Sequence, residues 1–305
     1  DDGVYVADYD RDGWRDVLAV GGEAPALFRN DGGTFARDDA FPTVGGEVKS
    51  ALFVDYDGDR WEDLVLLRSH ATPVVLHNEE GTFERTGMDL GNLSYPMGAT
   101  AGDYDGDGDA DLLVYQSGDW ANGKPEGYFS LYQYLEEDNG HPNVLYENTG
   151  DGFERVADSG IGESERWSLA ASFVDLNDDG RPDVHVANDY NTDTVYINEG
   201  DGTFAERVLR GNTSRNGMSS EVADVNGDGH PDVFTTNIYL PLEEVADDER
   251  YERLRLLFGY VLKSGRTKGN TMMINDGSGN LSDEAVSYGV REGGWGWWSR
   301  GGPGG

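Results

Sequence analysis

The stretch DYDGDGDAD, Asp103–Asp111, decides the fold because it recurs along the chain. Related strings are DYDRDGWRD (Asp8–Asp16), DYDGDRWED (Asp55–Asp63), DLNDDGRPD (Asp175–Asp183) and DVNGDGHPD (Asp224–Asp232). Acid or amide side chains stand at positions 1, 3, 5 and 9 of each, and four of the five have Gly at position 6. The starts lie 47, 48, 72 and 49 residues apart, so the unit is about 48 residues long with one insertion. A fixed period of this length indicates a repeat architecture.

A second signature follows each acidic string: an apolar pair runs into Asn, then a Gly-rich turn, then an aromatic residue or Leu. This is the turn chemistry of a β-hairpin. The five copies are LFRNDGGTF (27–35), VLHNEEGTF (75–83), LYENTGDGF (145–153), VYINEGDGTF (195–204) and MINDGSGNL (273–281).

Short apolar runs flank the acidic strings and are too short for helices, so they predict strands. Each unit then holds four strands, which is what a β-propeller blade requires. We therefore predict an all-β propeller over residues 1–298, with a disordered tail at 299–305 and one inserted α-helix. The predicted blades are residues 1–44, 45–92, 93–162, 163–213 and 214–289, with a partial sixth at 290–298 and insertions at 116–143 and 238–270.

The acidic strings have the pattern of calcium loops. Oxygen ligands at alternate positions wrap a cation of this size, and Gly at position 6 permits the sharp bend. No Glu stands at position 12, as an EF-hand would need, so each loop closes at position 9 and enters a strand. Up to five structural Ca²⁺ ions are expected, with the second loop weakest because Arg60 replaces the Gly. Backbone carbonyls at position 7 add a ligand in each loop: Trp14, Trp61, Asp109, Arg181 and His230.

Composition narrows the functional classes. The 305 residues carry 59 acidic and 23 basic residues, a net charge of −36, which argues against a nucleic-acid or basic membrane-surface binder. There is no Cys, so thiolate sites and disulfides are excluded. No apolar run is long enough to span a bilayer. The excess of Asp and Glu and the scarcity of Lys suggest a halophilic source. The alternative interpretation is that part of the acidic side chains binds cations.

These residues resemble the FG-GAP/VCBS repeats of integrin-α-type β-propellers, and within them the CRTAC1/ASPIC–UnbV-type extracellular proteins. The strings that carry the resemblance are VANDYNTDTVYINEGDGTF, GMSSEVADVNGDGHPDVFTTNI and GVREGGWGW. It implies Ca²⁺ binding by the side chains of Asp8, Asp10, Asp12 and Asp16; Asp55, Asp57, Asp59 and Asp63; Asp103, Asp105, Asp107 and Asp111; Asp175, Asn177, Asp179 and Asp183; and Asp224, Asn226, Asp228 and Asp232.

The sequence also departs from that family. Its propellers commonly have seven blades, whereas five loops are visible here, and a sixth unit breaks off into SRGGPGG. The C-terminal ASPIC/UnbV-type domain is missing. The chain is therefore expected to be a fragment.

The connection between the first and second strands of a blade and the connection between the third and fourth lie on one face of a propeller. Both insertions fall between a second and a third strand, so they lie on the opposite face. The first insertion is rich in aromatic residues, and the second has apolar residues at helical spacing from Leu242 to Val261. Either insertion forms a recognition surface or simply covers the scaffold. A possible ligand face on the same side comprises Trp167, Asn188, Asp189, Met218 and Asn237, for which local turn capping is the alternative.

No catalytic string is present, and the abundance of carboxylates makes acid pairs uninformative about catalysis. The favoured function is an extracellular or cell-surface adhesion scaffold for a protein or glycan ligand. A polysaccharide-acting propeller enzyme remains the alternative; convergence of Arg166, Arg207, Arg210 and Arg215 with a Tyr or His would favour it. A passive partner module for a missing C-terminal domain is the third. The tryptophans Trp295, Trp297 and Trp298 fit a truncated strand better than a sugar platform.

Overall fold

The fold is described from a computed structural model over residues 3–21, 24–118, 140–189, 191–209, 216–237 and 269–293. The described residues form strands and connections and contain no helix. In chain order the strands are β1 (Gly3–Ala7), β2 (Asp16–Val20), β3 (Ala26–Asp31), β4 (Thr34–Arg37); β5 (Val48–Val54), β6 (Asp63–Arg68), β7 (Val74–Glu79), β8 (Thr82–Arg85); β9 (Pro96–Gly102), β10 (Asp111–Gln116), β11 (Val144–Asn148), β12 (Phe153–Arg155); β13 (Trp167–Val174), β14 (Asp183–Asp189), β15 (Thr194–Asn198), β16 (Phe204–Val208); and β17 (Glu221–Ala223), β18 (Asp232–Thr235), β19 (Thr271–Asn275), β20 (Leu281–Asp283).

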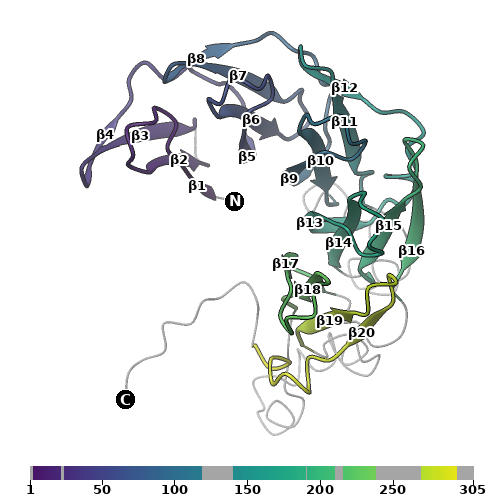
Figure 1. The fold of residues 1–305 in the computed structure, drawn as a ribbon. Helices are drawn as coiled ribbons and strands as arrows, with labels where there is room; N and C mark the ends of the chain where they lie inside the picture. Colours follow the sequence, from purple (N-terminus) through teal and green to yellow (C-terminus); the bar gives the residue numbers. More distant parts are fainter. Residues whose placement is uncertain are drawn as a thin grey trace, which may run out of the picture.

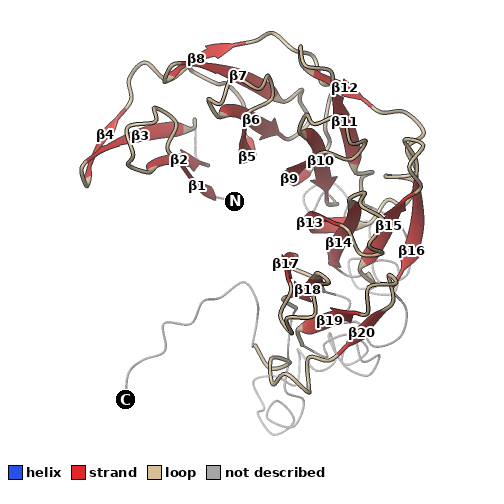
Figure 2. Ribbon diagram, viewed as in Figure 1, coloured by secondary structure: helices blue, strands red, loops and turns tan. Residues whose placement is uncertain are grey.

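These strands make five four-stranded antiparallel sheets, each paired in simple sequence order. The first strands β1, β5, β9, β13 and β17 contact one another in series along the inside of an arc. The fourth strands lie on its outer rim (Figure 1; secondary structure in Figure 2). The prediction of an all-β propeller with four-stranded blades is confirmed. The inserted helix, most of the aromatic insertion and Trp295, Trp297 and Trp298 lie outside the described residues.

The second and third blades are buried on both sides, which explains why their second strands, β6 and β10, are mostly apolar. In β6, Leu64 and Leu66 pack in the cluster shared with the first blade, and Val65 and Leu67 in the cluster shared with the third. Successive side chains of a strand point to opposite faces. One short run therefore supplies two inter-blade cores.

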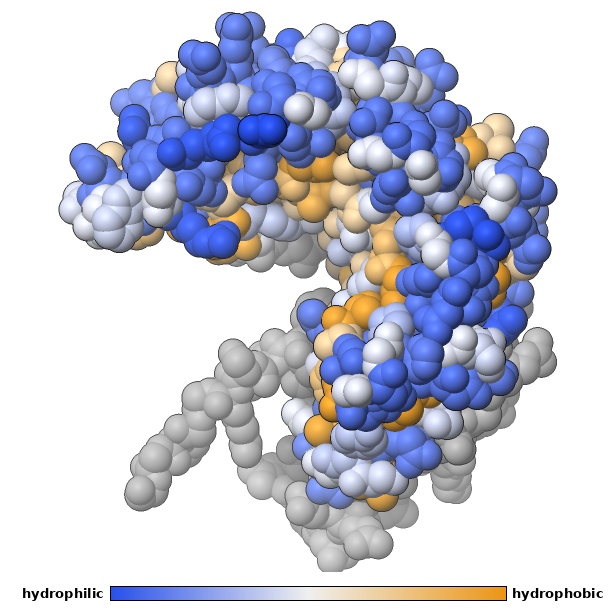
Figure 3. Space-filling model, in the orientation of Figure 1, coloured by the Kyte–Doolittle hydropathy of each residue, from blue (hydrophilic) through white to orange (hydrophobic). Residues whose placement is uncertain are grey.

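The first blade differs because one of its faces has no neighbouring blade among the described residues. Val4 and Val6 of β1 are 68% and 50% exposed, whereas Leu18 and Leu27 on the other face are fully buried. In Figure 3 hydrophilic residues cover most of the visible face and the rim, and hydrophobic residues show along the concave side of the arc. No helix in the described residues is long and apolar enough to cross a membrane.

Candidate metal centres in the acidic loops

The loop between the first and second strand of each blade is shaped by its own aspartates. In the third blade, Asp103 accepts hydrogen bonds from the backbone N–H groups of Gly106 and Gly108, at 2.8 and 3.1 Å. Asp105 accepts from the N–H of Asp107, and Asp107 from that of Asp109. In the other four loops, too, the side chain at position 3 accepts from the N–H of position 5, and the side chain at position 5 accepts from the N–H of position 7. Positions 1, 3 and 5 are thereby held on one curved segment.

Carboxylates of the loops converge closely enough to share a cation. Ligand oxygens lie within 4.8 Å of one another in three sets, namely Asp8, Asp10 and Asp12; Asp55, Asp57 and Asp59; and Asp103, Asp105 and Asp111. Asp8 Oδ1 is also buried without a hydrogen-bond donor. Several hard oxygen donors around one point, with an acceptor left unsatisfied, fit Ca²⁺. In the fourth and fifth loops Asn177 and Asn226 stand at position 3, and each amide nitrogen donates to the position-5 aspartate.

The aspartate at position 9 also accepts hydrogen bonds from the backbone of the acidic loop and of the hairpin. Asp111 is fully buried, and it accepts from Tyr104 N on Oδ2 (2.9 Å) and from Asn148 N on Oδ1 (2.8 Å). The same two bonds occur at Asp16, Asp63, Asp183 and Asp232. Burial raises the pKa of Asp63 and of Asp111 to about 6, against the lowering effect of these N–H donors. Position 9 thus ties the acidic loop to the hairpin through backbone hydrogen bonds.

The hairpin asparagine is a residue that sequence reasoning took only for a turn former. The Nδ2 of Asn148 donates to Ala110 O in its own blade and to Tyr56 O in the preceding blade. Asn78 reaches Tyr9 O and Asn198 reaches Tyr104 O in the same way, at 2.9 and 2.7 Å. Its presence in all five hairpins was the available signal. These asparagines link blades directly beneath the acidic loops.

Position 6 adopts the left-handed conformation in every loop. Gly13 and Gly108 have φ of 93° and 97°, and Arg60 has φ of 78° at the corresponding place in the second loop. A side chain in this region is strained. The sequence singled out Arg60 as the exception at position 6. The structure shows that its backbone keeps the left-handed conformation that the glycines adopt in the other loops.

Two of the position-7 residues, Trp61 and His230, contact a neighbouring loop through their side chains. The Arg11 guanidinium of the first loop lies over the ring of Trp61 in the second, 5.3 Å from its centroid. His230 Nδ1 of the fifth loop lies 2.7 Å from Asp178 Oδ2 of the fourth. Side chains thus join the first loop to the second and the fourth loop to the fifth.

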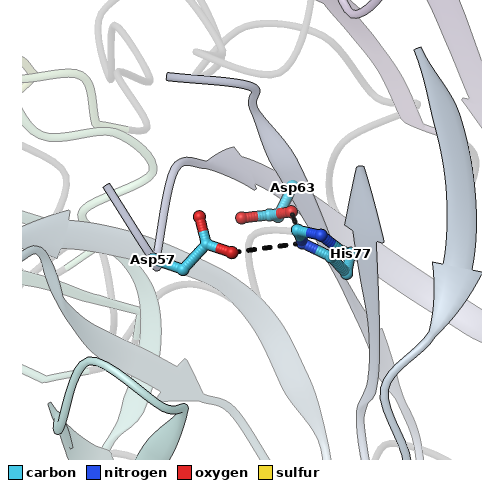
Figure 4. Close-up of side chains that lie close together, drawn as sticks. All are labelled: Asp57, Asp63 and His77. Atoms are coloured by element: carbon cyan, nitrogen blue, oxygen red, sulfur yellow. Dashed lines mark hydrogen bonds and ion pairs between the residues drawn. The ribbon is translucent and has the colours of Figure 1, made fainter. Parts of the chain in front are cut away.

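In the first two blades the side chain just before the hairpin asparagine lies against the acidic loop of its own blade. Arg29 Nε is 2.7 Å from Asp10 Oδ2, and that carboxylate raises the pKa of the guanidinium. In the second blade His77 takes this place, with Nδ1 3.0 Å from Asp63 Oδ1 and 3.3 Å from Asp57 Oδ2. Figure 4 shows the imidazole edge directed at the two carboxylates. No sequence pattern had assigned a role to this position.

The possible ligand face is placed differently from the loops. Trp167, Asn188, Asp189 and Asn237 are buried, and Met218 is half-buried. The Asn188 amide donates to Thr192 O, and its oxygen accepts from the Ser168 hydroxyl. These contacts are those of connection capping. Of the arginines that would favour an enzyme, Arg166 pairs with Glu206 at 2.7 Å and Arg207 donates to Gly279 O; Arg210 and Arg215 lie outside the described residues.

A buried polar group stands apart from the loops, between the fourth and fifth blades. His185 occupies the strand position held by Leu18, Val65 and Leu113 in other blades, and its Nε2 lies 4.0 Å from Asp193 Oδ2. Both side chains are almost fully buried. Burial lowers the pKa of His185 to about 4 and raises that of Asp193 to about 7. The pair is therefore uncharged in mildly acidic solution.

Comparison with known proteins agrees with the repeat geometry. The family model described as an FG-GAP-like repeat matches residues 8–66, 55–114, 122–186 and 175–235. The chain belongs to the FG-GAP-like repeat family. Three of the matched ranges run from one acidic loop to the strand after the next, and the range 122–186 contains the fourth loop alone and ends in the strand that follows it. A comparison with curated protein sequences found no significant match.

Two solved structures share the FG-GAP-like chain's fold at low sequence identity. One is an Agrocybe aegerita lectin that recognises non-reducing terminal N-acetylglucosamine, at 17% identity and TM-score 0.52, covering 92% of this chain and 65% of the lectin. The other is a putative 6-phosphogluconolactonase from Bacteroides uniformis, at 13% identity and TM-score 0.50, covering 92% and 68%. The chain thus spans less than two thirds of the lectin's length.

Proposed function

We propose that this chain is a calcium-stabilised FG-GAP-like scaffold for adhesion or recognition, acting outside the cell or at its surface. The observation that carries the proposal is the convergence of three carboxylates in each of the first three loops, from positions 1, 3 and 5 in the first two and from positions 1, 3 and 9 in the third. A loop with several acids repels itself when no cation is bound, so calcium binding and folding are coupled. Calcium here supplies stability, and the proposal assigns it no catalytic role.

The partner in this proposal is a protein or a glycan bound on the insertion-bearing side of the propeller, away from the loops. The lectin of similar fold makes terminal N-acetylglucosamine a reasonable first glycan to screen. Nucleic acid is a poor partner for a chain of net charge −36. We also propose the finer assignment to the ASPIC–UnbV-type extracellular proteins of a halophile, on the quoted strings and the shortage of Lys.

The test is calorimetric titration of Ca²⁺ into EDTA-stripped protein at high and at low NaCl, with circular dichroism recorded in parallel. We expect saturation near five ions and a gain of β signal. Two loops carry Asn at position 3 and one carries Arg29 against Asp10, so we expect unequal affinities within that total. Unchanged structure with no calcium uptake would show that the acidic residues serve salt adaptation instead.

A further inference from the structure

The five blades place four different kinds of side chain at one structurally equivalent position, the residue before the hairpin asparagine. These residues are Arg29, His77, Glu147, Ile197 and Ile274. The backbone around them is the same, because the following asparagine N–H binds the position-9 aspartate in every blade. What changes from loop to loop is therefore the chemistry offered to a cation, which is cationic in the first blade and a nitrogen donor in the second.

The second blade brings three ligand atoms of two kinds together. Asp57 comes from the acidic loop, Asp63 from the start of β6 and His77 from β7, and their donor atoms lie within 4.8 Å of one another. The imidazole Nδ1 is 3.0 and 3.3 Å from the two carboxylate oxygens (Figure 4). Ligands bound at about 2.1 Å to one ion, at octahedral or tetrahedral angles, stand roughly 3.0 to 3.4 Å apart. Both observed nitrogen–oxygen spacings lie within that range.

The surroundings hold the three groups in place. Asp63 is fully buried and fixed by Asn78 N and Tyr56 N, while the ring of His77 meets Tyr56 edge-on, with centroids 6.2 Å apart. Asp57 retains the shape of its loop through the Asp59 N–H on Oδ1, which leaves Oδ2 directed to His77. A set of ligands supported by such contacts needs little rearrangement to bind an ion.

We propose that Asp57, Asp63 and His77 form a mixed nitrogen–oxygen site that binds a first-row transition ion such as Zn²⁺ or Co²⁺, distinguishing the second loop from the other four. Imidazole suits these ions, whereas Ca²⁺ takes oxygen ligands only. His77 binds through Nδ1 with its proton on Nε2. The inference deepens the proposed cation-binding role of the loops.

The experiment is a Co²⁺ titration of EDTA-stripped protein in the presence of excess Ca²⁺, which fills the oxygen-only loops. We expect one Co²⁺ per chain, visible d–d absorption and a hyperfine-shifted imidazole N–H resonance that disappears in D₂O. In His77→Gln the resonance is lost and the Co²⁺ affinity falls roughly tenfold or more. Zn²⁺ displaces the Co²⁺ from the unaltered protein.

The matched control is His70→Asn, which removes an exposed histidine of the same blade from the connection between β6 and β7. His70 has φ of 53°, a conformation that Asn tolerates, and this variant keeps the Co²⁺ site. Circular dichroism and the calcium stoichiometry of the remaining loops verify that His77→Gln is folded.

Two further outcomes separate this inference from the proposed function. Co²⁺ spread over several loops with no shifted imidazole signal, or full retention of the site in His77→Gln, overturns the inference and leaves calcium binding untouched. A single nitrogen-ligated Co²⁺ in a protein that takes up no Ca²⁺ supports the inference and removes the proposed calcium scaffold.

Discussion

The amide nitrogen of Asn148 donates a 2.7 Å hydrogen bond to the carbonyl oxygen of Tyr56, 92 residues earlier in the chain. Tyr56 is position 2 of the second acidic loop, and Asn148 begins the hairpin turn of the third blade. The contact therefore joins the two repeated signatures across a blade boundary. Neither signature reveals it alone.

This relationship predicts a difference between two asparagines in equivalent places. Asn148 and Asn275 are both buried, and each accepts a hydrogen bond from a turn glycine, but the Nδ2 of Asn275 has no acceptor. Asn148→Ala should therefore lower the free energy of unfolding by about 1–2 kcal/mol more than Asn275→Ala does. Urea unfolding at fixed calcium measures both. Equal losses would mean that the two bonds donated by Asn148 Nδ2, to Tyr56 O and Ala110 O, add nothing to stability.

A second prediction separates the structural role of position 9 from calcium binding at position 5 in the third loop. Asp111→Asn replaces an acceptor oxygen with an NH₂ group facing a backbone N–H, so the protein should lose about 2–3 kcal/mol even in EDTA. Asp107→Asn, at the exposed position 5, should leave the calcium-free protein nearly unchanged and remove one calcium from the titration. If both variants behave alike in EDTA, position 9 has no structural role of its own.

Relief of backbone strain is the third prediction. Arg60→Gly removes a side chain from a position with φ of 78°. We expect about 1 kcal/mol of added stability in EDTA, measured as a rise in the urea midpoint. Arg11→Gly at position 4 provides the comparison: its φ is 54°, but it gives up the stacking on Trp61, so its net gain should be smaller.

The buried His185–Asp193 pair predicts compensating effects of pH. Asp193, with a folded pKa of about 7 against 3.8 unfolded, contributes stability that is complete below pH 3.8 and is lost as the pH rises through 7. His185, with a folded pKa of about 4 against 6.5, destabilises the fold as the pH falls from 6.5 toward 4. Between about pH 4 and 6.5 the two slopes oppose each other.

Asp193→Asn removes the pH dependence that Asp193 contributes to the stability of the fold. Its stability relative to the unaltered protein should therefore rise by roughly 1.4 kcal/mol per pH unit from about pH 4 to 7 and level off above pH 7. Chemical denaturation at fixed salt, compared between the two proteins at each pH, cancels the titration of the acidic loops. A flat difference across that range would show that Asp193 ionises as freely in the fold as in the unfolded chain.

The sequence predicted the strands and the acidic loops because both depend on local patterns. The short apolar run from Leu64 to Leu67 indicated the strand β6, and the spacing of Asp8, Asp10 and Asp12 at alternate loop positions indicated that the three carboxylates converge. The asparagine bonds and the place of His77 could not be read in the same way. They depend on which strand lies beneath which loop, and side chains far apart in the chain meet only after the sheets have stacked.

The asparagine contacts also give assembly of the arc a direction. In each observed case the donor belongs to the later blade and the acceptor to the earlier one, as in Asn78 to Tyr9 and Asn198 to Tyr104. Because synthesis runs from the N-terminus, the acidic loop that carries the acceptor carbonyl is made before the asparagine that binds it. At these three boundaries the donor side chain of the later blade therefore meets a carbonyl oxygen in the acidic loop of a blade that was synthesised before it.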